Sequence, residues 1–290
     1  MAHRSVQYYY DDGTDIFLVG GVLYKLHRTV LQATGSPLFC DMFMIPQPKD
    51  SKDKVEGTSD EKPIVVPQAT AEEFHNLLEL YLYPKWTPPP HPVSRYIDVL
   101  KLSTQWGMSN VREAAIWNIS QYNNRELAAT TKLELARRYN IPQWGGPAFR
   151  QLVNRPLKSL SNDDLDCIGV AAFVVLAKAN EAIAEERRLV ATKTPPNVCC
   201  AQCTHHVECS RAWKDVWWNK IAPSILHPDP GWAIAFPGEI KQKVSGLQVQ
   251  GMGQGCRDET IAAVLDGCGF DGVGIITDMA VARVEKLLFS

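Results

Sequence analysis

The sequence lacks any long hydrophobic run. Its longest apolar stretch, residues 169–177, is far shorter than the roughly 20 residues that a membrane-spanning helix needs. The N-terminal segment MAHRSVQYYYDDGTD contains no apolar core of the secretory type. We therefore expect a protein of the cytosol or the nucleus, with no membrane partner.

A strong charge of either sign is also missing. The chain has 30 Lys and Arg residues against 32 Asp and Glu residues, which gives a formal net charge of -2. Proteins that bind nucleic acids through their phosphates usually show a clear excess or patch of basic residues. We therefore expect no nucleic-acid partner.

Familiar catalytic patterns are absent too. The sequence shows no paired-carboxylate or Ser-His-Asp signature. Its glycine-rich stretch, residues 251–255, resembles a phosphate loop only superficially, because no strand clearly precedes it and no Lys-Ser/Thr pair follows. We predict a protein that is not an enzyme, with no catalytic residue and no cofactor-binding residue.

The chain of 290 residues has room for two small domains. Residues 1–14 are interpreted as an N-terminal tail and residues 15–122 as the first domain. Its start predicts a hairpin, because two alternating apolar segments flank Gly20-Gly21, a two-residue turn signal. Short helices, a short strand before Pro67 and an amphipathic helix follow. The stripe of that helix comprises Phe74, Leu77, Leu78, Tyr81 and Leu82.

Two segments of the first domain are predicted to be loops. Residues 46–63 are polar and show no hydrophobic periodicity. Residues 85–93 contain four prolines, which excludes a helix there. We expect a mobile loop in the first case and an extended surface loop in the second.

Residues 123–290 are predicted to be mainly α-helical. Helical patterns cover residues 133–139, 144–153, 163–190 and 211–221, and a last one covers residues 278–289. Between His227 and the last helix the pattern weakens into connections rich in proline and glycine.

The stretch DIFLVGGVLYKLHRTVLQATGSPLF resembles the start of a BTB/POZ domain. Asp15, the hairpin, His27-Arg28, Leu31 and Phe39 match that family's pattern of an aspartate, alternating strands and H-[KR]-x-x-L…F. The joint spacing of these residues carries the resemblance more than any single position does.

Later segments extend the resemblance over residues 15–120. Residues 71–83 resemble the family's F..LL.Y.Y helix, and residues 96–106 resemble its LL.LA..W helix. The proline-rich insertion and the Trp-rich tail are similar to BTB proteins that are expanded in mushroom-forming fungi. The resemblance implies an α+β fold: a BTB/POZ domain with a small sheet flanked by helices, followed by a mainly α-helical C-terminal region.

The resemblance also implies a function in protein interaction. BTB domains self-associate or dock partners, so we expect an adaptor that forms a homodimer or hetero-oligomer, in transcriptional regulation or ubiquitin-ligase targeting. Asp15, His27 and Arg28 are the candidate partner-binding residues, since positions matching Asp15 and Arg28 line a charged pocket at the dimer interface of related members. A structural interpretation stays open for each: a strand cap, a hydrogen-bonded core histidine and a surface charge, respectively.

Two features differ from the family pattern. Members that exchange an N-terminal strand across a dimer have a longer segment before the aspartate, whereas fourteen residues precede Asp15. Members that recruit a cullin scaffold often carry a hydrophobic-x-Glu motif, and residues 43–47 contain no glutamate. Cullin recruitment is therefore less supported than partner docking in general.

The chain has eight cysteines, and several of them gather in residues 199–209. In the predicted compartment they would be reduced thiols or metal ligands. Cys200 and Cys203 have the C-x2-C spacing of a zinc knuckle, and His206 with Cys209 could complete a tetrahedral zinc site. Reduced thiols beside a helix are the alternative, because structural zinc sites usually separate their ligand pairs by a longer loop. A zinc- or thiol-dependent enzyme centred on this cluster is the other functional hypothesis.

Just downstream, Trp213, Trp217, Trp218 and Ile221 share one face of a predicted helix. Such a stripe indicates either core packing or an exposed surface for a partner. We expect core packing.

Overall fold

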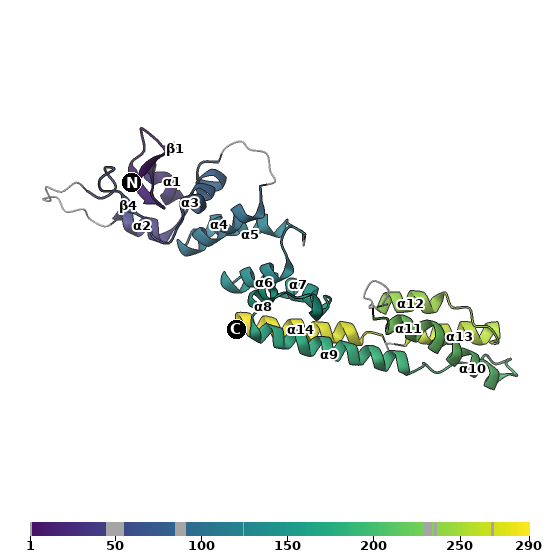
Figure 1. Cartoon of the computed structure of the whole chain (residues 1–290). Coiled ribbons are helices and arrows are strands. Elements are labelled where there is room, and N and C mark those ends of the chain that lie inside the picture. Colours follow the sequence, from purple (N-terminus) through teal and green to yellow (C-terminus); the bar gives the residue numbers. More distant parts are fainter. Residues whose placement is uncertain are drawn as a thin grey trace. The chain divides into compact units, whose positions relative to one another are not determined.

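The computed structural model describes residues 2–44, 55–84, 91–123, 125–228, 234, 237–267 and 270–290. The chain divides into two compact units, Met1–Ala128 and Ala129–Ser290. The first unit holds a small mixed sheet with helices, and the described part of the second is helical (Figure 1). The structure therefore has the α+β composition that the sequence predicts, with the strands in the N-terminal part.

The sheet of the first unit has four strands in the order β1-β3-β2-β4. Their bounds are β1 His3–Tyr9, β2 Asp15–Val19, β3 Val22–Leu26 and β4 Ile64–Val65. The predicted hairpin is confirmed: β2 and β3 pair antiparallel, and Gly20 and Gly21 turn between them with φ of 55° and 85°, where glycine avoids a Cβ clash. The outer strands β1 and β4 each run parallel to their neighbour.

The prediction of a tail over residues 1–14 was wrong for β1. This strand is mostly exposed, and its fully buried member is Tyr8, whose ring packs edge-on against His75 at 5.1 Å between centroids. One buried tyrosine gives no alternating hydrophobic pattern, so the sequence did not reveal the strand.

The described residues of the first unit form five α-helices. They are α1 Arg28–Ala33, α2 Pro37–Met44, α3 Ala71–Leu77, α4 Val93–Gln105 and α5 Ser109–Ser120, and α3 continues into a π-helical turn, η1 Leu78–Leu82. A capping box of Thr70 and Glu73 starts α3. Phe74, Leu77 and Leu78 of the predicted stripe are buried, which confirms that this face is core.

The two predicted loops lie partly outside the described residues. Residues 45–54 and 85–90 are not described. In the described remainder of the first loop, Gly57 accepts a backbone hydrogen bond from Ile16 and donates one to Lys62, and Ser59 forms a β-bridge with Lys62. The segment after residue 54 is therefore attached to the sheet. Correspondingly, the second loop ends where α4 begins, at Val93.

The helices of the second unit are more numerous than the sequence predicted. Their bounds are α6 Ala129–Arg138, α7 Pro142–Val153, η2 Leu157–Ser159, α8 Asn162–Ile168, α9 Val170–Thr192, α10 His206–Val216, η3 Trp217–Ile221, α11 Ala222–Ile225, α12 Pro237–Ser245, α13 Gln254–Asp266 and α14 Gly272–Phe289. The helices α12 and α13 occupy a region that we interpreted as connections. The apolar residues of α12 are few, and those of α13 are mostly consecutive, at residues 261–265, so neither helix showed a clear stripe in the sequence.

The predicted single helix over residues 163–190 was wrong. It is divided at Gly169, whose φ of 78° ends α8 and starts α9, and the two helices meet at 105°. Apolar residues continue through the break, so hydrophobicity alone could not locate it. Among the described residues, no single helix has the length and apolar character to cross a membrane; the α8–α9 pair passes such a test only when its two bent parts are joined.

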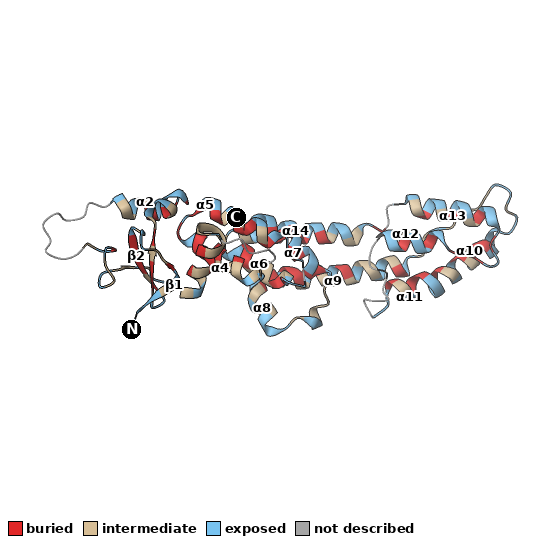
Figure 2. Ribbon diagram, turned by 90° about the horizontal axis from the view of Figure 1, so that it is seen from above, coloured by how far each residue is buried: buried red, intermediate tan, exposed pale blue. Residues whose placement is uncertain are grey.

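Two hydrophobic clusters lie along α9. The first packs α14 and α7 on its N-terminal part, around residues such as Phe149, Leu176 and Val284. The second gathers α10, η3, α12 and α13 near its C-terminal end at Ala191. Figure 2 shows the buried residues of these helices along one side of each, as expected for amphipathic helices.

The second cluster contains most of the tryptophan stripe. Trp213, Trp217 and Ile221 are 1%, 0% and 0% exposed, whereas Trp218 is 49% exposed. Both buried indoles donate to backbone carbonyls, Trp213 to Pro195 and Trp217 to Ala191, each at 2.9 Å. The core interpretation is confirmed for these three residues.

Candidate functional site

Asp15 and Arg28, two of the three predicted partner-binding residues, meet in the first unit. Arg28 Nε donates to Asp15 Oδ2 at 3.1 Å, and Nη2 donates to Oδ1 at 2.5 Å. The Thr14 hydroxyl donates to the same carboxylate at 2.7 Å and accepts from the backbone N–H of Arg28 at 2.8 Å. Hydrogen bonding to Asp15 raises the pKa of Arg28. The pair thus ties the start of β2 to the start of α1.

Burial differs between the two partners. The Asp15 side chain is 5% exposed, and that of Arg28 is 45% exposed. The guanidinium carbon also lies 4.6 Å from the centroid of the Phe43 ring on α2. The carboxylate is therefore enclosed, while part of the arginine is accessible at the surface.

His27, the third predicted residue, takes part in a different set of contacts. Its backbone N–H donates to the Tyr83 hydroxyl at 3.0 Å, and its Nδ1 lies 3.1 Å from the same oxygen. Its Nε2 lies 3.2 Å from an Asp12 carboxylate oxygen, and this hydrogen bond lowers the pKa of Asp12. The structure thus brings Asp15 and Arg28 together and places His27 with Tyr83 and Asp12.

The sulfur-rich part of the second unit brings together more cysteines than the predicted set. The Sγ atoms of Cys199, Cys203 and Cys256 lie within 4.8 Å of one another. Cys209 Sγ is 3.8 Å from Cys203 Sγ, and Cys200 Sγ is 3.4 Å from Cys256 Sγ. Five thiols therefore gather at one place.

Three structural elements position these cysteines. An extended segment after α9 carries Cys199 and Cys200 and leads through a turn at residues 201–202 to Cys203. Cys209 lies in the first turns of α10, and Cys256 lies at the start of α13. The extended segment is fastened to α13 by Thr260, whose hydroxyl accepts from the Val198 N–H at 2.9 Å and donates to the Val198 carbonyl at 3.0 Å.

Backbone and amide N–H groups point at several of the sulfur atoms. Asn197 Nδ2 donates to Cys199 Sγ at 3.3 Å, and the backbone N–H of Cys200 donates to Cys256 Sγ at 3.3 Å. The backbone N–H of His205 lowers the pKa of Cys203, and hydrogen bonds from neighbouring thiols act in the same direction.

The pKa of Cys256 is shifted in the opposite direction. The backbone N–H of Cys200 lowers its pKa, but burial and the hydrogen bonds to Cys203, Cys200 and Cys209 outweigh that effect and raise it to about 12. The pKa values of these two thiols are thus shifted in opposite directions, downward for Cys203 and upward for Cys256.

The predicted zinc ligand set is only partly brought together. Cys203 and Cys209 belong to the cluster, and Cys200 borders it through Cys256. His206 is exposed and lines a shallow surface cavity with Val207 and Arg211. Among the described residues, the converging group of potential metal ligands consists of cysteines alone.

Cys199 and Cys256 were missed by the sequence prediction. Cys199 was overlooked because the C-x2-C spacing directed attention to its neighbour Cys200. Cys256 is 56 residues from Cys200, and no other cysteine lies within zinc-knuckle spacing of it. No local signal in the sequence identified it, because the buried position of Cys256 follows from the packing of α13.

The histidines that a thiol enzyme would need point elsewhere. His205 Nδ1 lies 2.9 Å from the Thr204 hydroxyl, and both residues are exposed. A catalytic thiol requires an imidazole within hydrogen-bond reach, oriented by a third group. The cluster geometry therefore favours metal binding or simple thiol packing over nucleophilic catalysis.

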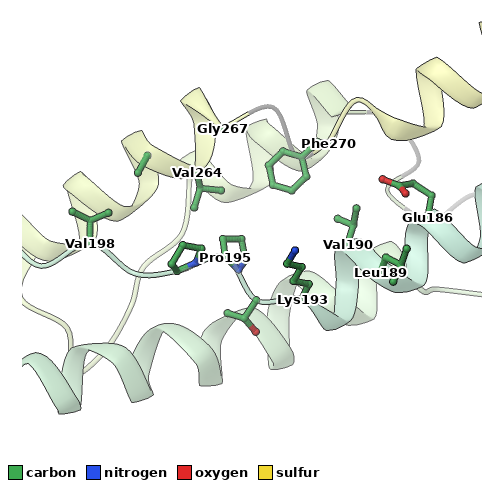
Figure 3. Close-up of a pocket in the computed structure, with 12 residues that line it drawn as sticks. Glu186, Leu189, Val190, Lys193, Pro195, Val198, Val264, Gly267 and Phe270 are labelled. Atoms are coloured by element: carbon green, nitrogen blue, oxygen red, sulfur yellow. The ribbon is translucent and has the colours of Figure 1, made fainter.

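An apolar groove adjoins the extended segment in the same unit. Its volume is about 560 Å³, and Figure 3 shows Val190, Pro195, Val264 and Phe270 facing it, with Lys193 among them. The groove lies between the C-terminal part of α9 and α13, on the segment that leads to Cys199.

Comparisons with protein-family models, with curated proteins and with solved structures find no match for this chain. Its function has to be inferred from its own residues.

Proposed function

We propose that residues 15–122 form a BTB/POZ-type interaction domain and that the chain is a non-catalytic adaptor. One observation carries the proposal: the residues of the BTB-like pattern are those that hold the first unit together. Leu31, Phe39 and Trp106 are buried, and Phe39 and Trp106 pack edge to face at 5.7 Å. Asp15 and Arg28 join the hairpin to the first helix.

The order of the elements supports the same proposal. A hairpin, two short helices, a strand, an amphipathic helix and a helix pair follow one another in the structure, as the resemblance implies. The strand β4 pairs with β2, so it joins the sheet next to the hairpin. Residues 123–290 would then be the helical region that follows such a domain.

The edge of the sheet at β1 is the docking surface that the geometry favours. β1 has seven residues, its pairing with β3 is irregular between Arg4 and Tyr9, and Val6 in this part is 101% exposed. β4, at the other edge, has two residues. A long open edge strand is a template for pairing with another chain, whereas a very short one is protected by its length.

The partner-binding role of Asp15, His27 and Arg28 remains part of the proposal. The accessible part of Arg28 could meet a partner's acidic group, while Asp15 holds the guanidinium in position. Action in transcription or with a ubiquitin ligase, in the cytosol or nucleus, rests on the resemblance alone. The segment in which a cullin-recruiting glutamate is sought extends beyond Met44, outside the described residues.

Self-association of the full chain tests the proposal by sedimentation velocity over a range of concentrations. We expect a dimer that Val6→Lys weakens by at least tenfold in Kd, because a lysine on an open edge opposes strand pairing. Val65→Lys is the matched control, since Val65 is 60% exposed on the opposite edge, and it should leave the dimer intact.

The outcomes separate clearly. A strict monomer at tens of micromolar, or a dimer that both variants leave unchanged, would refute self-association through β1. Circular dichroism of both variants checks that folding is retained.

A further inference from the structure

Three cysteine sulfurs of the second unit converge, and the sulfur of Cys209 lies beside one of them. Cys199, Cys203 and Cys256 are mutually within 4.8 Å, and Cys209 lies 3.8 Å from Cys203. Cys209 thus adjoins the three-sulfur group through Cys203, and it would have to approach at least one of the other two sulfurs to complete a tetrahedron. Cys200 instead contacts Cys256 and packs against Gly255.

The spacing of these sulfurs fits a tetrahedral zinc ion. A Zn–S bond of about 2.3 Å places two ligands of a tetrahedron about 3.8 Å apart. The Cys203–Cys209 separation of 3.8 Å has this value, and the three-cysteine group needs a contraction of at most about 1 Å per pair to reach it. Rotation about the Cys side-chain torsions is enough for such a movement.

The hydrogen bonds around the sulfurs are those expected for thiolates. The Asn197 amide points at Cys199, and the Cys200 backbone N–H points at Cys256. A neutral thiol is a weak acceptor, whereas a metal-bound thiolate is strengthened by such donors in its outer shell. Two N–H groups aimed at two separate sulfurs are therefore an independent indication of a metal centre.

We propose that Cys199, Cys203, Cys209 and Cys256 bind one zinc ion that has a structural role. Four protein sulfurs complete the tetrahedron and leave no open position for water or substrate. Cys209 and Cys256 are 2% and 1% exposed, so the ion would sit at the margin of the second hydrophobic cluster. Cys200 supplies its backbone N–H, and His206 stays outside.

The zinc ion would join three parts of the second unit that are distant in sequence. It would connect the extended segment and α10 to α13, beside the buried Trp213 and Trp217. Because the unfolded chain has no preformed site, the binding free energy would stabilise the fold of this region directly.

Metal analysis of the full chain, purified without a histidine tag, tests the proposal. We expect one zinc per chain by elemental mass spectrometry. Cys199→Ser and Cys256→Ser should lose most of the metal, while His206→Ala and Cys167→Ser should keep it, because His206 is exposed and Cys167 lies near Glu134. Cys200→Ser should also retain zinc, since it preserves the backbone donor.

A spectroscopic measurement on the wild-type chain guards against misfolded variants. After chelator treatment, titration with Co²⁺ should give the intense visible bands of tetrahedral thiolate coordination and a thiolate-to-metal charge-transfer band, saturating at one ion per chain. Clearly substoichiometric zinc without these bands would overturn the proposal, as would disulfides in freshly isolated protein. Loss of zinc in His206→Ala together with retention in Cys256→Ser would assign the metal to a different ligand set.

Discussion

The Asp15–Arg28 pair allows a quantitative test of whether these residues hold the fold or bind a partner. Arg28→Met removes the charge but keeps an apolar chain beside Phe43. It leaves a carboxylate that is 5% exposed without its two guanidinium donors. Hydrogen bonds to charged groups contribute about 1.5–3 kcal/mol each. Because Arg28 is 45% exposed, solvent screens the pair, and we expect a total loss of about 1.5–3 kcal/mol rather than twice that amount.

A double-mutant cycle isolates the interaction. With Asp15→Asn as the second change, the coupling free energy should be about 1–2 kcal/mol, and the double variant should be less destabilised than the two single losses added together. The two units need not unfold together, so hydrogen exchange of peptides from the β2–β3 hairpin is the suitable measurement.

The Arg4–Asp60 pair serves as the control for this cycle. It is short, at 2.7 Å, but the Arg4 side chain is 63% exposed. Arg4→Met should cause no resolvable change in hairpin exchange, because solvent screens an exposed ion pair. A coupling below about 0.5 kcal/mol for Asp15 and Arg28 would refute the structural role. Normal stability combined with lost self-association would then assign the pair to a partner surface.

Two further predictions concern the backbone and pH. Gly20→Ala should destabilise the first unit by about 2–5 kcal/mol in chemical denaturation, because the φ of Gly20 is positive and a new Cβ would lie 2.6 Å from the Ala71 backbone nitrogen. Gly21→Ala, which has open space around it, should cost only about 1–2 kcal/mol. Equal losses of stability in the two variants would contradict this reasoning. The Ser161 backbone N–H lowers the pKa of Asp164. This carboxylate therefore contributes stability above its unfolded pKa of about 3.9, and that stability is lost as the pH falls through the lower folded pKa. Asp164→Asn should reduce the fall of the thermal unfolding temperature at acid pH, and an unchanged fall would contradict the assignment.

The sequence predicted those elements in which local signals and packing agree. The hairpin has a two-residue glycine turn between alternating strands, and α3 has both a capping box and an apolar stripe. The break at Gly169 was missed because the apolar pattern is the same on both sides of it. Strand β1 was missed because pairing with β3, not its own hydrophobicity, places it in the sheet.

The candidate sites also show that local sequence patterns indicate contacts only between elements that are close in the sequence. Asp15 and Arg28 are thirteen residues apart and join the ends of adjacent elements, so a local motif could indicate their pairing. The cysteine cluster depends on α10 and α13 sharing one hydrophobic cluster, an association across more than forty residues that no spacing rule describes. The C-x2-C pattern indicated the region in which the cysteines gather. It led to the prediction of Cys200 and His206 as ligands, whereas the structure brings Cys199 and Cys256 to the cluster.

The two proposals can succeed or fail independently, because they lie in different compact units. The β1 edge belongs to Met1–Ala128, and all four proposed zinc ligands belong to Ala129–Ser290. Removing zinc should therefore loosen the packing of α10 and α13 while leaving a β1-mediated dimer intact. If chelation dissolved the dimer instead, the second unit would have to contribute to self-association, and a docking surface confined to β1 would no longer account for it.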